Sequence, residues 1–161
     1  MAHDPFHGFA KRPDYLGAFG FLETDAGVLL VSNRRVIGGR EQEVWDLPGG
    51  GVEPGESLTE ALTREMREET GLDVGVAELL FLAEGERIRG GVRTGVWRSF
   101  FFRIERRAGE IDLSGDPDIL SYRFEPLASL PPLLTAPYHG GFLAWLGSGR
   151  RLRHAWDRWE D

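Results

Sequence analysis

Short apolar blocks separated by glycine-containing breaks run through the first third of the chain. Residues 16–22 and 28–31 are two such blocks, and the intervening Asp25-Ala26-Gly27 is typical of a turn. The pattern therefore predicts a hairpin. Further along, we expect a loop at Gly38-Gly39, a short extended segment at residues 44–47 and another break at Pro48-Gly49-Gly50-Gly51.

The spacing of apolar residues changes to that of a helix over residues 57–70. Ser57 followed by Glu60 fits a capping box, and Gly71 fits the residue just past a helix end. An advance of about 100° per residue gives this helix one apolar face. We expect that face to be buried, and it consists of Leu58, Ala61, Leu62 and Met66.

The second half of the chain predicts three more strands and two more helices. The strands are expected at residues 74–83, 96–105 and 119–124, and residues 85–95, rich in glycine and arginine, are expected to form a loop. Residues 138–146 predict a helix. The segment 150–159 predicts a helical tail docked on the body or, alternatively, a helix that binds a partner or a membrane surface. Its helical spacing is carried by Leu152, Ala155, Trp156 and Trp159.

Strands outnumber helices, and they both precede and follow the central helix. This order predicts an α+β protein in which helices pack on a mixed sheet. No internal repeat and no long linker divides the 161 residues, so we expect one domain spanning residues 1–161.

The composition of the chain limits which metals and ligands it is expected to bind. The chain has no cysteine, so a metal would be held by oxygen or imidazole ligands, which favours Mg²⁺ or Mn²⁺ over zinc. The net charge of -7 argues against binding to a nucleic-acid backbone but not against a small phosphorylated ligand.

The N-terminus lacks a basic start followed by an apolar run, and no stretch approaches the roughly 18 apolar residues of a membrane span. We therefore expect a cytoplasmic protein with no membrane association.

Carboxylates fall within the apolar stripe of the central helix. Glu65 and Glu69 lie inside the stripe and Glu68 lies at its edge. A glutamate-rich helix is usually a solvated face with ion pairs, but buried carboxylates need compensation, and Arg64 cannot neutralise all three. A hard divalent cation can, because oxygen ligands spaced three and four residues apart converge beside a helix. The pattern therefore indicates a metal site.

The same helix carries a longer motif. Gly50, five residues, Glu56, seven residues and then Arg64-Glu65-Met66-Arg67-Glu68-Glu69-Thr70-Gly71-Leu72 resembles the complete box of the Nudix hydrolase family, in its MutT-like form. The resemblance implies a Nudix-type α/β/α sandwich with a core at about residues 16–146, an N-terminal arm and a Trp-rich C-terminal tail. It also implies Mg²⁺-dependent hydrolysis, with Mn²⁺ as a possible substitute, of a nucleoside diphosphate linked to another group.

The resemblance assigns roles to the residues of the box. It implies that Glu65, Glu68 and Glu69 bind metal, together with the backbone carbonyl of Gly50. Arg64 would orient the glutamates, and Glu65 or Glu69 would also help to deprotonate the attacking water. A further carboxylate is expected downstream; Asp118 is the first choice, with Glu110, Asp112 and Asp116 as the other candidates.

The box does not specify the substrate. Arg35 follows the second strand, where some family members place a phosphate-binding arginine, and a proline typical of ADP-ribose hydrolases is missing from residues 84–88. A nucleoside triphosphate or related nucleotide is therefore expected, bound by a monomer or homodimer. A sugar nucleotide, a dinucleoside polyphosphate and a non-catalytic nucleotide-sensing role are the alternatives. Candidate substrate-binding residues are Arg34, Arg35, Arg89 and Trp97, although exposed arginines and core tryptophans are common.

Overall fold

Two β-sheets form the centre of the protein, and the computed structural model describes them within residues 14–160. Residues 1–13, which belong to the expected N-terminal arm, lie outside the described range. The larger sheet is mixed, with order β5-β1-β7-β6-β9, and contains β1 (Tyr15–Phe21), β5 (Gly49–Gly51), β6 (Asp73–Arg89), β7 (Val92–Ala108) and β9 (His154–Glu160). In the smaller, antiparallel sheet, β3 (Gly27–Ile37) pairs with β2 (Glu23–Thr24), β4 (Arg40–Asp46) and β8 (Ile119–Glu125).

Helix α1 (Leu58–Thr70) forms where the capping box predicts it. The Ser57 hydroxyl accepts the Glu60 amide at 3.2 Å, and the Glu60 carboxylate accepts the Ser57 amide at 2.8 Å. The helix ends at Gly71, whose φ of 72° is left-handed and whose amide donates to the Arg67 carbonyl. These caps fix both ends of the helix and therefore the direction in which its glutamates point.

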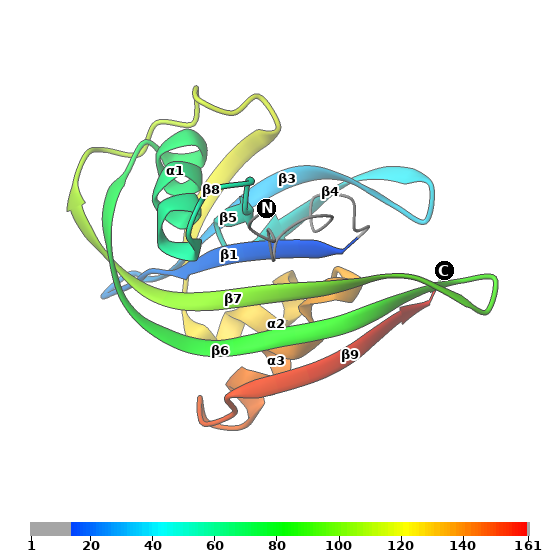
Figure 1. Ribbon diagram of the computed structural model, residues 1–161. Coiled ribbons are helices and arrows are strands. Elements are labelled where there is room, and N and C mark those ends of the chain that lie inside the picture. The colour runs from blue at the N-terminus through cyan, green and yellow to red at the C-terminus, as the bar shows by residue number, and fades with distance from the viewer. Residues whose placement is uncertain (1–13, 161) are drawn as a thin grey trace, which may run out of the picture.

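Helices cover both faces of the larger sheet, which confirms the predicted mixed α+β fold. The buried face of α1 packs on one side, against a cluster that includes Phe102 and Ile104. Helix α3 (Gly140–Gly147), preceded by a 3-10 turn (Pro137–His139), packs on the other side, where Phe142 and Trp145 contact Phe81. Figure 1 shows α1 on one side of β6 and β7, and α3 with the short α2 (Leu130–Leu133) on the other. Another 3-10 turn (Leu127–Ser129) leads into α2. No helix among residues 14–160 is long and apolar enough to cross a membrane.

The predicted first hairpin is only partly right. Both predicted strands exist, but β1 pairs with β5 and β7 in the larger sheet, whereas β3 belongs to the smaller one. The hairpin turn instead joins β3 to the two-residue β2. The glycines at 49–51, expected as a break, form the short strand β5. The local pattern identified the strands but not their partners, because pairing between distant segments leaves no trace in neighbouring residues.

The predicted glycine- and arginine-rich loop at residues 85–95 is wrong. Strands β6 and β7 continue through it as one long hairpin that turns at Gly90 and Gly91. Gly85 lies within β6, and a Cβ there would collide with the ring of Trp97, its partner on β7. This glycine therefore makes room for an indole and does not mark a loop.

The predicted C-terminal helical tail is also wrong. Residues 154–160 form β9, which runs parallel to β6 and extends the larger sheet. Exposed and half-buried residues alternate along it, as expected of a strand with two different faces. Ala155, Trp156 and Trp159 fit helical spacing, but over so short a segment two periods cannot be separated reliably.

Candidate active site

The most deeply buried carboxylate of the α1 glutamates belongs to Glu69, which is only 4% exposed. Burial raises its pKa to about 8; the neighbouring Glu65 and Asp116 add to this shift, and Arg35 opposes it. Its Oε2 accepts a hydrogen bond from the Gly49 amide at 3.0 Å. An ionised Glu69 therefore needs more positive charge than its present surroundings supply.

Glu65 lies beside Glu69 and against the glycine strand β5. Burial raises the pKa of Glu65, an effect that Arg64 opposes and that Glu68 and Asp116 increase. A Cβ placed on Gly50 would lie only 2.8 Å from Oε1 of Glu65, so the backbone comes close to this carboxylate because residue 50 has no side chain. Gly50 and Glu65 therefore lie close together, and their joint role in binding a metal stays a prediction.

Arg64 forms hydrogen bonds with three carboxylates, one from the segment before α1 and two from α1 itself. Its guanidinium donates to Glu56 at 2.8 and 2.9 Å, to Glu65 at 2.9 Å and to Glu68 at 3.2 Å. It also donates to the carbonyl of Gly51 at 3.0 Å. The hydrogen bonds to Glu56 are the main cause of the raised pKa of Arg64. Arg64 thus holds Glu65 and Glu68 in place and leaves Glu69 without a guanidinium contact of this kind.

The residues present suit a hard divalent cation. Among residues 14–160, no three histidine or carboxylate side chains already surround a single point as a ready metal cage. Even so, the charge of Glu65 raises the pKa of Glu69, and the backbone amide of Gly49 on β5 donates to Glu69, while Glu68 is half-exposed. Oxygen donors of this kind, short of compensating charge, are those that Mg²⁺ prefers. Glu65 and Glu68 would give up part of their contact with Arg64 to bind it.

A cavity of about 530 Å³ is lined by residues of β1, β3, β6, β7 and β9. Tyr15 and Arg35 belong to its lining, and both act electrostatically on the glutamate cluster: Arg35 lowers the pKa of Glu69, whereas Glu65 and Glu69 raise that of Tyr15. Burial is the main reason why the pKa of Tyr15 is about 12. The cavity lining and the glutamates are therefore coupled electrostatically. The volume is within the range of small-ligand pockets, roughly 300–1,000 Å³.

A buried aspartate, Asp46, forms hydrogen bonds with several residues at the wall of this cavity. Asp46, 3% exposed, accepts hydrogen bonds from Asn33 at 2.9 Å and from the Tyr138 hydroxyl at 2.8 Å. Arg35 contacts the same carboxylate at 3.4 Å, and Nε2 of His139 lies 2.8 Å from it. The sequence did not predict this group, because Asn33, Asp46 and Tyr138 come together only in the folded chain.

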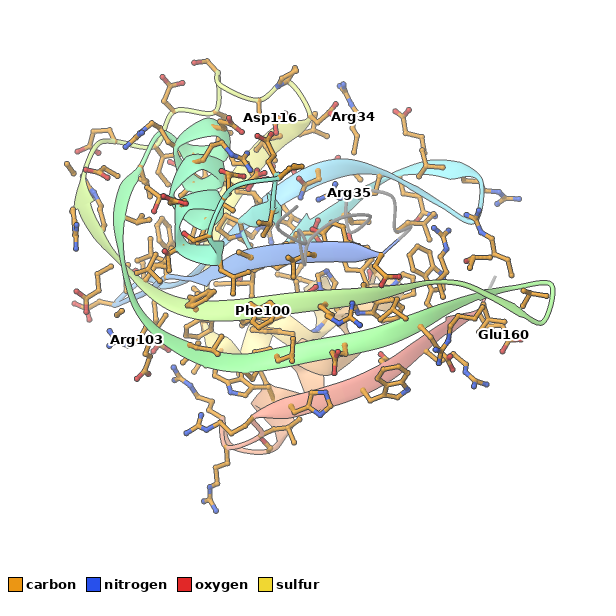
Figure 2. The ribbon with its side chains drawn as sticks, in the orientation of Figure 1. Arg34, Arg35, Phe100, Arg103, Asp116 and Glu160 are labelled. Atoms are coloured by element: carbon orange, nitrogen blue, oxygen red, sulfur yellow. The ribbon has the colours of Figure 1, made fainter. Side chains whose placement is uncertain are left out.

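The structure separates the four predicted substrate-binding residues. Arg35, Arg89 and Trp97 line the cavity. Arg34 is exposed and does not line it, because successive residues of β3 point to opposite faces. Figure 2 shows Arg34 directed to the outer side of β3, away from Arg35.

Of the four downstream acids, the structure favours Asp116 over Asp118 and Glu110. Asp116 contributes to the raised pKa values of both Glu65 and Glu69, and Figure 2 shows it beside α1. Asp118 is exposed, and its backbone amide donates to the Asp116 carboxylate at 2.9 Å. Glu110 is 90% exposed and pairs with Arg106. Asp116 is therefore the loop acid whose charge acts on both glutamates, and which acid serves as a ligand stays a prediction.

Comparison with known proteins decides the family. The model of the NUDIX domain matches residues 12–146, a span that contains α1, the cavity-lining strands β1, β4 and β7, and the loop with Asp116. The chain belongs to the NUDIX family. This confirms the resemblance seen in residues 50–72, and it makes the protein a hydrolase of phosphoric anhydrides.

Two curated relatives and one solved structure are similar to this chain. It is 31% identical to an RNA pyrophosphohydrolase of Rhodopseudomonas palustris, over 68% of this chain and 75% of that protein. It is 34% identical to the mouse 8-oxo-dGDP phosphatase NUDT18, over 78% of this chain but only 36% of that longer protein. A crystal structure of a MutT protein from Methanosarcina mazei matches with a TM-score of 0.67 and 22% identity, covering 88% of this chain and 99% of that one. The last comparison supports the fold alone.

Proposed function

We propose that this protein is a Mg²⁺-dependent enzyme that hydrolyses the pyrophosphate bond of a nucleoside triphosphate or a related nucleotide. The observation that carries the proposal is the electrostatic coupling of two regions: a buried glutamate cluster short of positive charge, and a cavity of small-ligand size whose lining residues Arg35 and Tyr15 interact with those glutamates through their charges. A ligand in the cavity can place its phosphates beside the glutamates.

Each residue has a proposed part in the reaction. Glu65, Glu68, Glu69 and the Gly50 carbonyl would hold the cation, and Arg64 keeps the first two glutamates in position. The cation, when bound, supplies positive charge for the phosphates and lowers the pKa of a water molecule. Glu65 or Glu69 would take a proton from the attacking water as the water oxygen forms its bond to phosphorus. The anhydride P–O bond then breaks and its electron pair leaves with the departing phosphate.

Arg35 supports a substrate with a phosphate next to the cleaved bond. Its guanidinium donates to Asp46 at 3.4 Å, and its positive charge lowers the pKa of Glu69, so this arginine is oriented before the ligand arrives. Arginine contacts to phosphate are charge-assisted and often bidentate. A nucleoside triphosphate provides such a phosphate. The relative from Rhodopseudomonas is named for RNA, but the net charge of -7 here favours a mononucleotide over a long polyanion.

A substrate panel tests the proposal. The purified protein with Mg²⁺ would be given nucleoside triphosphates, 8-oxo-dGDP, ADP-ribose, a sugar nucleotide, a dinucleoside polyphosphate and a 5′-triphosphorylated RNA oligonucleotide. We expect the highest kcat/KM for a nucleoside triphosphate, with release of phosphate or pyrophosphate. A tenfold preference for ADP-ribose, a sugar nucleotide or RNA would contradict the substrate assignment while leaving the NUDIX membership intact.

A further inference from the structure

The last strand of the chain lies outside the region that matches the family model, yet it reaches the active-site cavity. The match ends at residue 146, whereas β9 begins at His154. Trp159, near the end of β9, belongs to the cavity lining together with Tyr15 and Arg35. The chain therefore supplies a part of the cavity from beyond its matched region.

Strand β9 is held firmly enough for this role. Seven consecutive residues pair with β6, from His154 opposite Leu82 to Glu160 opposite Ile88. On the outer face of the sheet, Glu86 joins β9 to β7, since it accepts from Arg158 at 2.9 Å and from Arg93 at 2.6 Å. These contacts, together with the ladder of backbone hydrogen bonds, fix the position of Trp159 along the sheet.

The two tryptophans of β9 have different surroundings. Trp156 is 53% exposed and does not line the cavity, whereas Trp159 lies three residues later on the opposite face, the face that lines the cavity. The guanidinium of Arg87 lies 4.2 Å from the centre of the Trp159 ring. The ring centres of Tyr138 and Trp159 are 6.3 Å apart, and the Tyr138 hydroxyl donates to Asp46. Trp159 is thus packed into the same assembly that positions Arg35.

A second indole lines the same cavity. Trp97 on β7 lies across Gly85 of β6, where any side chain would collide with it. Gly85 and Arg87 are two residues apart on β6 and point to the same face, so Trp97 and Trp159 lie over neighbouring positions of that strand. The cavity therefore presents flat aromatic surfaces beside its polar inner end, a combination suited to a planar ring that carries a phosphate chain.

We propose that Trp159 is a specificity-determining residue, against which the base of the nucleotide stacks while the phosphates extend toward Arg35 and the glutamates. The inference rests on the proposed function for the identity of the ligand. Stacking on an indole needs only a π-face, so this contact favours nucleotides over anhydrides that lack a base without selecting one base by hydrogen bonds.

Substitutions on β9 test the inference with a matched control. The variants are Trp159→Leu, which keeps an apolar side chain without an aromatic ring, Trp159→Phe, which keeps a ring, and Trp156→Leu on the other face of the strand. Three quantities are measured with Mg²⁺: KM and kcat for ATP and GTP, the dissociation constants of AMP and GMP by calorimetry, and inhibition by inorganic pyrophosphate, which has no base. Circular dichroism and melting temperature check that each variant is folded.

We expect Trp159→Leu to raise KM and the dissociation constants about fivefold or more, given the usual contribution of base stacking. Trp159→Phe should restore most of the affinity, Trp156→Leu should match the wild type, and pyrophosphate should inhibit all of them equally. Unchanged nucleotide affinity in Trp159→Leu, an equal loss in Trp156→Leu, an equal loss for pyrophosphate, or no nucleotide binding at all would overturn the inference. If no nucleotide is hydrolysed but AMP binding still depends on Trp159, the proposed function fails and the inference stands.

Discussion

Two buried carboxylates of this protein have opposite surroundings. Asp46 is met by donors from Asn33, Arg35 and Tyr138, so its charge is compensated within the protein. Glu69 accepts one backbone hydrogen bond and has carboxylates as neighbours, and burial raises its pKa to about 8. A buried carboxylate with enough hydrogen-bond donors is stable as an anion, whereas one with few donors is stabilised by binding a cation. We therefore propose that Asp46 has a structural role and that Glu69 is a metal ligand.

Removing the Asp46 carboxylate should destabilise the fold. Asp46→Ala leaves several buried or half-buried donors without an acceptor, so we expect a loss of about 2–4 kcal/mol in the free energy of unfolding. Tyr138→Phe removes only one of these hydrogen bonds and should cost about 1 kcal/mol. Urea unfolding measures both. Equal, small effects of the two substitutions would show that the hydrogen-bond network around Asp46 contributes little to stability.

The two adjacent arginines of β3 should differ sharply in their effect on activity. Arg35→Ala should lower kcat/KM for a nucleoside triphosphate by roughly tenfold or more, since a charge-assisted contact is worth about 1.5–3 kcal/mol. Arg34→Ala is the control, because this side chain does not line the cavity. Steady-state kinetics with both variants decides the matter, and similar effects of the two would show that the cavity does not bind the phosphates.

At the level of elements, the sequence predicted best what local chemistry determines. Helix α1 has its caps, its apolar face and its glutamates within fifteen residues, and the structure has all of them as expected. The C-terminal tail was not predicted as β9 because its partner, β6, lies some seventy residues earlier in the chain, and no local pattern contains that pairing. The Asp46 group escaped prediction for the same reason, since Tyr138 and Asp46 come together only in the folded chain.

The loop between β7 and β8 carries the remaining test of the metal site. Asp116→Asn should lower the affinity for Mg²⁺ and the rate, because Asp116 is the loop acid whose charge acts on both Glu65 and Glu69. Asp118→Asn is a suitable control, since its side chain is exposed. Mg²⁺ titrations of activity distinguish the two. A larger effect from Asp118→Asn would restore the assignment made from the sequence.

For the molecule as a whole, Mg²⁺ should act as a stabilising ligand. A cation that binds only the folded state relieves the repulsion between Glu65 and Glu69, and at a concentration 100-fold above its dissociation constant it adds about 2.7 kcal/mol to stability. The melting temperature should therefore rise with Mg²⁺ at constant ionic strength, and the rise should vanish in Glu69→Gln. An unchanged melting temperature in the wild type would count against a metal site formed by the folded chain.

The most direct test of the account is nucleoside triphosphate hydrolysis measured in wild type, Glu68→Gln, Glu69→Gln and Arg67→Ala, each with Mg²⁺ and with excess chelator. Each Gln variant keeps the shape of the side chain and loses its charge, whereas Arg67 is exposed on the other side of α1. We predict turnover only with Mg²⁺, a loss of orders of magnitude in both Gln variants, and a near-normal rate in Arg67→Ala. Undiminished turnover in chelator, or near-normal rates in Glu69→Gln, would contradict the central claim.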